Sequence, residues 1–120
     1  SGKDFAVSLE NDRKVIHWLR PTKDQFDLQY KFEGIVHEYE PDFVVETDDT
    51  CYLVEVKRRS KMNDPQVLAK KQRGLDYCKK ATQWCIANHH KPWKYLFIPH
   101  DQITETTSFE SYLINFLVKE

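Results

Sequence analysis

Short apolar runs alternate with polar residues along most of this 120-residue chain. Residues 26–32 (FDLQYKF) alternate apolar and polar positions, which predicts a half-buried strand that ends before a turn marked by Gly34. Apolar runs predict four more strands, over residues 15–19, 35–47, 51–57 and 93–99. The chain therefore has enough strands to form a sheet.

Three other segments have the spacing of helices. Residues 3–12 repeat an apolar face at helical intervals. The longest helix is predicted to begin with Asp64 as N-cap and Pro65 as its first residue, and to end near residue 88. An amphipathic helix over residues 108–118 closes the chain. This order predicts an α/β (α+β) fold with a central mixed β-sheet flanked by helices.

Length and composition indicate one globular domain. The sequence is 40% apolar and 13% aromatic, and a chain of this length can bury a sizeable core. Three cysteines, an odd count, fit reduced thiols and a cytoplasmic location. No apolar run approaches the roughly 20 residues that span a bilayer, so we expect no membrane contact. Ser1-Gly2 resembles a remnant of tag removal, which leaves residues 3–120 as a single domain.

The segment EPDFVVETDDTCYLVEVK, residues 40–57, places charged residues on two predicted strands. A connecting loop of two or of four residues gives the same register, in which Asp42 lies directly opposite Glu55 with Cβ atoms about 5 Å apart. Lys57 follows Glu55 by two residues and therefore shares its face of the sheet. The opposite face is predicted to be core and carries Phe43, Val45, Tyr52, Val54 and Val56.

Two carboxylates at this separation repel each other unless a cation compensates them. Mg²⁺ suits the pair, because it takes one or two carboxylates and completes its shell with water and phosphate oxygens. A neighbouring lysine can stabilise charge on a phosphate. The other interpretation is a partly buried ion pair, in which Lys57 contacts Asp42 or Glu55. The three residues alone leave both interpretations open.

Pro41-Asp42, followed after a short hairpin by Glu55-Val56-Lys57, resembles the signature of PD-(D/E)xK nucleases. The surrounding segments FAVSLEND, VIHWLRP, YEPDFVVE, YLVEVKRRSKMNDP and KPWKYLFIPHDQI are similar to the C-terminal endonuclease domain of the helicase-containing subunit of type III restriction enzymes. The resemblance covers residues 5–109. It implies a restriction-endonuclease-like fold and a metal-dependent endonuclease that hydrolyses DNA phosphodiester bonds.

The resemblance also implies roles for the residues of the signature. Asp42 and Glu55 match the catalytic carboxylates that bind Mg²⁺, for which Mn²⁺ is an alternative. Val56 matches the position that lends a backbone carbonyl to the metal, and Lys57 matches the catalytic lysine. Whether one or two metal ions bind stays open.

Nucleases of this family often add an acidic residue from the first helix. In type III relatives it is expected about one turn before Phe5, where Gly2 stands in this sequence. Asp4, Glu10 and an acid missing from this sequence are the candidates, and the sequence does not choose among them.

The implied partners are double-stranded DNA, upstream helicase motor domains of the same chain and a modification subunit. Restriction and repair remain alternative roles. Two other classes of function also stay open. One is a catalytically inactive DNA-binding or docking module that retains the nuclease fold, and the other is a structural domain with a buried ion pair.

A basic stretch follows the signature, although the net charge of the chain is −1. Seven residues between positions 57 and 73 are basic and one is acidic. A solvated surface and a DNA-backbone contact are equally weighted interpretations of this stretch. In the second case the contacts are expected from Arg58, Arg59, Lys70, Lys71 and Arg73.

Overall fold

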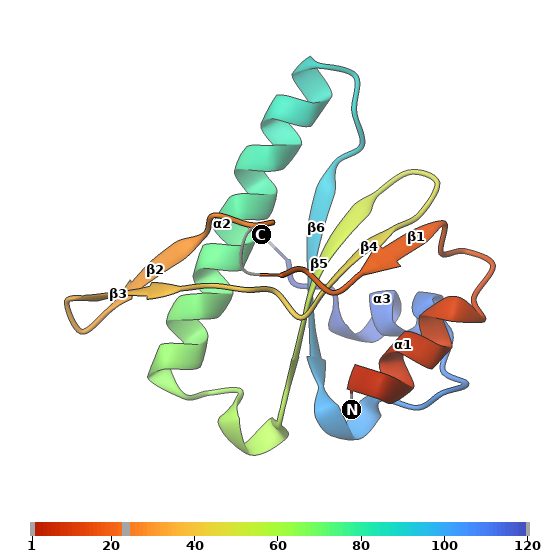
Figure 1. Cartoon of the computed structure of the whole chain (residues 1–120), viewed down its shortest axis with the longest axis horizontal. Helices are drawn as coiled ribbons and strands as arrows, with labels where there is room; N and C mark the ends of the chain where they lie inside the picture. The colour runs from red at the N-terminus through yellow and green to blue at the C-terminus, as the bar shows by residue number, and fades with distance from the viewer. Residues whose placement is uncertain (1, 23–24, 120) are drawn as a thin grey trace.

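A computed structural model describes residues 2–22 and 25–119 of the chain. Helices and strands follow one another along the chain as Figure 1 shows. In order they are α1 (Gly2–Glu10), β1 (His17–Leu19), β2 (Gln29–Phe32), β3 (Ile35–Glu38), β4 (Phe43–Glu46), β5 (Cys51–Lys57), the 3₁₀ turn η1 (Arg59–Lys61), α2 (Pro65–Ala87), β6 (Trp93–Pro99), the 3₁₀ turn η2 (His100–Gln102) and α3 (Phe109–Phe116).

Four strands form a mixed sheet in the order β1-β4-β5-β6. β1, β4 and β5 pair antiparallel, whereas β5 and β6 run parallel. The long helix α2 lies on one side of this sheet, and α1 and α3 lie on the other (Figure 1). The predicted α+β architecture, a mixed sheet between helices, is confirmed at this level.

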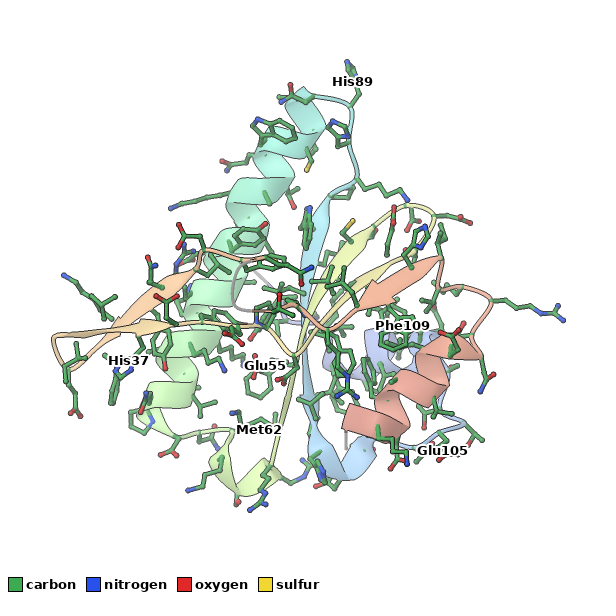
Figure 2. The ribbon with its side chains drawn as sticks, in the orientation of Figure 1. His37, Glu55, Met62, His89, Glu105 and Phe109 are labelled. Atoms are coloured by element: carbon green, nitrogen blue, oxygen red, sulfur yellow. The ribbon has the colours of Figure 1, made fainter. Side chains whose placement is uncertain are left out.

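The twofold alternation along β5 sends its side chains to two different cores. Tyr52 and Val54 face α1 and α3 and pack in a cluster with Phe109. Leu53 faces α2 and packs with Cys78. Because side chains two residues apart share a face of a strand, Glu55 follows Leu53 to the α2 side. Figure 2 shows Glu55 between α2 and the strands, well away from Phe109.

The prediction of one continuous strand over residues 35–47 is wrong. The chain leaves the extended ladder over residues 39–42, and Pro41 within this break has no N–H to donate to a ladder. β3 pairs only with β2 in a separate two-stranded sheet, and β4 belongs to the main sheet. Glu33 (φ 51°) and Gly34 (φ 77°) both adopt the left-handed conformation at the tip of this hairpin, as a two-residue turn requires.

Other element boundaries differ by a few residues from those predicted. The first helix is Gly2–Glu10 rather than residues 3–12, and the last is Phe109–Phe116 rather than residues 108–118. Strands predicted from residues 15 and 26 begin only at positions 17 and 29. The predicted strands over residues 51–57 and 93–99 agree with the structure, and α2 begins at Pro65 as predicted.

The hairpin of β4 and β5 has the predicted register. Phe43 pairs with Val54 and Glu46 pairs with Cys51, across a four-residue loop. Asp42 precedes the first of these pairs and is joined to the hairpin by a hydrogen bond from its N–H to the Val54 carbonyl, at 3.1 Å. The paired register ends at Phe43 and Val54, but Asp42 still lies close enough to Glu55 to raise the pKa of its carboxyl.

Among the described residues, no helix combines the length and the hydropathy that crossing a membrane requires.

Candidate active site

The main chain of the hairpin holds the Asp42 carboxylate in place. Asp42 lies immediately before β4, and its Oδ2 accepts a hydrogen bond of 2.8 Å from the Val56 backbone N–H. The carboxylate is half-buried. Since Val56 directly follows Glu55 in β5, this bond fixes the two acidic residues as neighbours at one end of the sheet.

The Glu55 carboxylate is buried with one oxygen unpartnered. Only 2% of the residue is exposed. Its Oε1 accepts a hydrogen bond of 3.2 Å from Lys70 Nζ, whereas its Oε2 has no hydrogen-bond partner among the described residues. A buried polar oxygen without a partner is uncommon in folded proteins and destabilises them. Ionised Glu55 would therefore be costly at this position unless a cation or a proton compensates it.

The pKa of Glu55 is raised to about 8, mainly by burial. The nearby Asp42 carboxylate also raises this pKa, by more than the Lys70 ammonium lowers it. At neutral pH the metal-free site therefore holds a proton on Glu55, and the charge of the two carboxylates is partly neutralised. A bound cation stabilises the ionised form instead. Proton and cation are thus alternative ways to relieve the same repulsion.

Lys57 was predicted beside these carboxylates, and it lies at the end of β5 opposite Pro99, half-buried. Among the described residues it forms no ion pair with Asp42 or Glu55. The alternative prediction of an ion pair between Lys57 and one of the two acids is therefore wrong, because a different lysine is the partner. The cation that contacts Glu55 is Lys70, from α2.

Sequence reasoning assigned Lys70 to the DNA surface and missed this role. The side chain is only about one-fifth exposed (21%), and its Nζ lies 5.0 Å from the centre of the Tyr39 ring. The Tyr39 and Tyr95 hydroxyls are hydrogen bonded to each other at 3.1 Å, and burial raises the pKa of both. Two neutral hydroxyls thus lie beside the contact between Lys70 and Glu55. The signal in the sequence was the helical face of α2, on which Lys70 precedes Cys78 by eight residues.

A cleft of about 270 Å³ opens beside Asp42. Arg20 borders it, with its guanidinium carbon 5.0 Å from the centre of the Phe43 ring, which orients this charged group toward the cleft wall. Arg20 and His100 were not predicted as site residues. The lining consists of Gly2, Arg20, Asp42, Phe43, Val56 and His100.

The first helix reaches this cleft through Gly2 at its N-terminal end. Within the described part of the chain, neither predicted acid of α1 lines the cleft. Glu10 lies at the other end of α1, where its Oε2 accepts a hydrogen bond of 2.7 Å from the Trp18 indole. The position one turn before Phe5 is thus the part of α1 nearest Asp42, and a glycine occupies it.

Two predicted DNA-contacting residues follow β5 directly. Arg58 is exposed. Arg59 donates from Nε and Nη2 to the two oxygens of Asp101, at 2.8 and 2.9 Å, and this guanidinium lowers the pKa of Asp101 to about 2. The ion pair connects η1 to η2 and so braces the segments that follow the parallel strands β5 and β6.

The other predicted DNA contacts lie on α2 and have partners inside the protein. Lys71 Nζ lies 4.9 Å from the centre of the Phe97 ring. Arg73 Nε donates a hydrogen bond of 2.9 Å to the Gln29 carbonyl of β2. With Lys70 on Glu55, three cations of this helix stabilise the fold, and whether they also contact DNA stays a prediction.

The donor set fits a hard divalent cation. Two carboxyl groups meet at one end of the central strands β4 and β5, and Mg²⁺ needs no more than one or two carboxylates from the protein. Within the described residues no group of three or more His, Cys, Asp or Glu side chains could hold a metal ion. Water and phosphate oxygens would therefore have to supply the remaining ligands.

No protein-family model, curated protein or solved structure matches this chain.

Proposed function

We propose that this domain is a Mg²⁺-dependent endodeoxyribonuclease with a restriction-endonuclease-like fold. One observation supports the proposal above the others: the buried Glu55 carboxyl lies next to Asp42, and its Oε2 accepts no hydrogen bond from the residues that the structure describes. Two buried acidic groups that repel each other stabilise a purely structural site poorly, whereas a divalent cation can bind both of them.

Each residue of the site has a separate task in the proposed reaction. Asp42 and Glu55 would hold Mg²⁺, or Mn²⁺ in its place, with the Val56 carbonyl as a further ligand. The ion would supply Lewis-acid chemistry at the scissile phosphate. Lys57 donates to a phosphate oxygen and stabilises the charge that develops there. Arg20, at the border of the cleft, binds the phosphate of the strand that enters it.

The proposed biological context follows from the sequence resemblance to type III restriction enzymes. In that context the substrate is double-stranded DNA in the cytoplasm, upstream helicase motor domains deliver it, and a modification subunit selects the site. The protein surface is compatible with a domain that relies on others for recognition, because the net charge is −1 and long-range attraction to DNA is therefore weak.

One observation favours a second candidate function, a DNA-binding or docking module without activity. Lys70 already gives Glu55 a cationic partner. A site that has lost metal binding can keep its carboxylate in this way, with a lysine in place of the metal ion. In that case the carboxylates bind no metal and the fold serves only to place the basic residues of α2 against DNA.

The test uses shape-conserving variants of the two acids. Asp42→Asn and Glu55→Gln should each abolish Mg²⁺-dependent nicking of supercoiled plasmid and the heat of Mg²⁺ binding in calorimetry. Glu46→Gln is the matched control, because Glu46 lies at the other end of β4 and is paired with Lys91 at 2.6 Å, away from Asp42. It should leave both readouts unchanged.

Lys57→Ala separates binding from chemistry. It should lose nicking and keep Mg²⁺ binding, because the lysine is not a ligand. Metal binding without any nicking by the unaltered protein, at every Mg²⁺ and Mn²⁺ concentration tried, would favour the inactive module. Nicking that survives in Glu55→Gln would refute the proposed site.

A further inference from the structure

Lys70 is not used by the proposed reaction, yet it lies in the middle of the site. It reaches Glu55 from α2, across the gap between helix and sheet. Its Nζ lies 3.2 Å from Glu55 Oε1, and the Tyr39 ring lies against the same ammonium with its centre at 5.0 Å. The ammonium is thus held between a carboxylate and an aromatic face, two groups that both attract a cation.

The close approach of α2 to the sheet keeps Lys70 in this position. Gly74, one turn further along α2, is buried against the hydroxyl pair of Tyr39 and Tyr95. A Cβ atom at this position would lie 2.6 Å from Tyr95 Cε1 and 2.9 Å from Tyr39 Oη. The helix can pack this closely only because residue 74 has no side chain.

A divalent cation and the Lys70 ammonium cannot both contact Glu55 without strong repulsion. One of them has to move. The side chain of Glu55 is 3% exposed, so the carboxylate has little freedom, whereas the side chain of Lys70 is 21% exposed and has a route toward solvent. Lys70 is therefore the group that yields when a metal ion binds.

We propose that Lys70 is the resident cation of the metal-free site, that it competes with Mg²⁺ for Glu55, and that after displacement it binds a phosphate of the substrate strand. This inference rests on the proposed function and adds to it a way in which Lys70 regulates metal binding. Metal binding releases the Lys70 ammonium, which can then bind a DNA phosphate. Metal binding and DNA binding therefore strengthen each other.

The first test measures Mg²⁺ affinity by calorimetry without DNA, at a pH well above the value of about 8 that burial gives Glu55. The margin is needed because Lys70→Gln removes a charge that lowers this pKa, and protons must not compete in either protein. Lys70→Gln removes the charge but keeps a hydrogen-bond donor. It should bind Mg²⁺ at least about fivefold more tightly than the unaltered protein, the lower end of typical coupling between sites. Lys71→Gln is the matched control, since it removes the same charge from the neighbouring position, and its affinity should not change.

Each other result of this titration counts against the inference. Equal gains in both variants would show an effect of net charge, and weaker binding by Lys70→Gln would show that the lysine supports the ligands. Lys70→Arg, which keeps the charge, should bind Mg²⁺ no more tightly than the unaltered protein, and it serves as the second variant if Lys70→Gln does not fold. If the unaltered protein binds no Mg²⁺, the proposed function fails as well. Unchanged affinity in Lys70→Gln refutes this inference alone.

The second test measures binding to duplex DNA in a Lys57→Ala background, which retains the metal ligands and should not cut. Adding Mg²⁺ should tighten DNA binding in this background. Lys70→Gln should remove most of that gain and reduce the slope of log affinity against log salt by about one, as expected for one lost phosphate contact. A gain from Mg²⁺ and a salt slope that both persist in Lys70→Gln would overturn the role of Lys70 as a phosphate ligand.

Discussion

The two faces of the main sheet bury different kinds of side chain. On the face of α1 and α3, Phe5 packs edge-on against Phe43 and Tyr112, with ring centres 4.8 and 5.3 Å apart. On the face of α2, the interior holds the Glu55 carboxylate and a lysine ammonium. The first face gains stability from apolar area removed from water. The α2 face gives up part of that stability because it buries ionisable groups next to one another. The proposed metal site lies on this face.

The largest effect of a single change is expected on the apolar face. Phe109 is 1% exposed and packs against Tyr52 with ring centres 5.2 Å apart. Phe109→Ala should lower the free energy of unfolding by about 3–5 kcal/mol through lost burial and the cavity that remains. Urea denaturation measures the loss, and Mg²⁺ affinity of the folded variant should be unchanged. A loss below about 1 kcal/mol would mean that the two faces do not differ as described.

The second effect is expected where α2 approaches the tyrosine pair. Gly74→Ala should destabilise the protein by about 1–3 kcal/mol through overpacking, although alanine is the better helix former. Thermal denaturation measures this loss. Gly34→Ala is a useful comparison, because φ is 77° there and no neighbouring atom is close, so its smaller cost is confined to the turn. If Gly74→Ala is stabilising, the contact between helix and sheet is looser than the structure indicates.

The third prediction concerns pH and only the face of α2. Between the ordinary pKa of 4.5 and the raised value of about 8, the folded protein keeps a proton on Glu55 that the unfolded chain has released. Raising the pH through this range should therefore destabilise the metal-free protein, by at most about 1.4 kcal/mol per pH unit. Urea titrations across the range measure this slope, and Glu55→Gln should remove it. A slope that survives in Glu55→Gln would have to come from another group.

The smallest effect is expected at the exposed Arg59–Asp101 ion pair. Both side chains are at least half exposed and screened by solvent, so Arg59→Ala should hardly change the free energy of unfolding, and less still at high salt. Its larger consequence should be for DNA, if this arginine contacts phosphate after leaving Asp101. Filter binding across a salt series separates the two effects. A large, salt-insensitive loss of stability would show that η1 and η2 depend on this pair.

Local sequence rules were sufficient where the contacts were close in sequence. The alternation along β5 and the even-numbered loop determined the register that brings Asp42 to Glu55. Pro41 was also visible in the sequence, and it should have ended the strand predicted over residues 35–47. Lys70 could not be placed in the same way, because the angle between α2 and the sheet decides which residue of the helix reaches Glu55.

The cleft beside Asp42 depended on still more distant contacts. Arg20 lies in the loop after β1, and His100 begins η2, so both segments had to be positioned beside α1 and the β4–β5 hairpin before this lining existed. No periodicity in the sequence links these residues. The same holds for Gly74, whose function as a close-contact position appears only beside Tyr95.

The β2–β3 hairpin determines where this molecule should open first. Two-stranded sheets are marginal on their own, and Ile35 and Val36, the first residues of β3, are more than half exposed. Amide hydrogens of this hairpin should therefore exchange with solvent far faster than those of β5, through local opening that leaves the main sheet intact. Tyr39 closes the base of the hairpin through its N–H to the Leu28 carbonyl, at 2.8 Å. Each opening would thus loosen the aromatic side of the ammonium site while its carboxylate side stays in place.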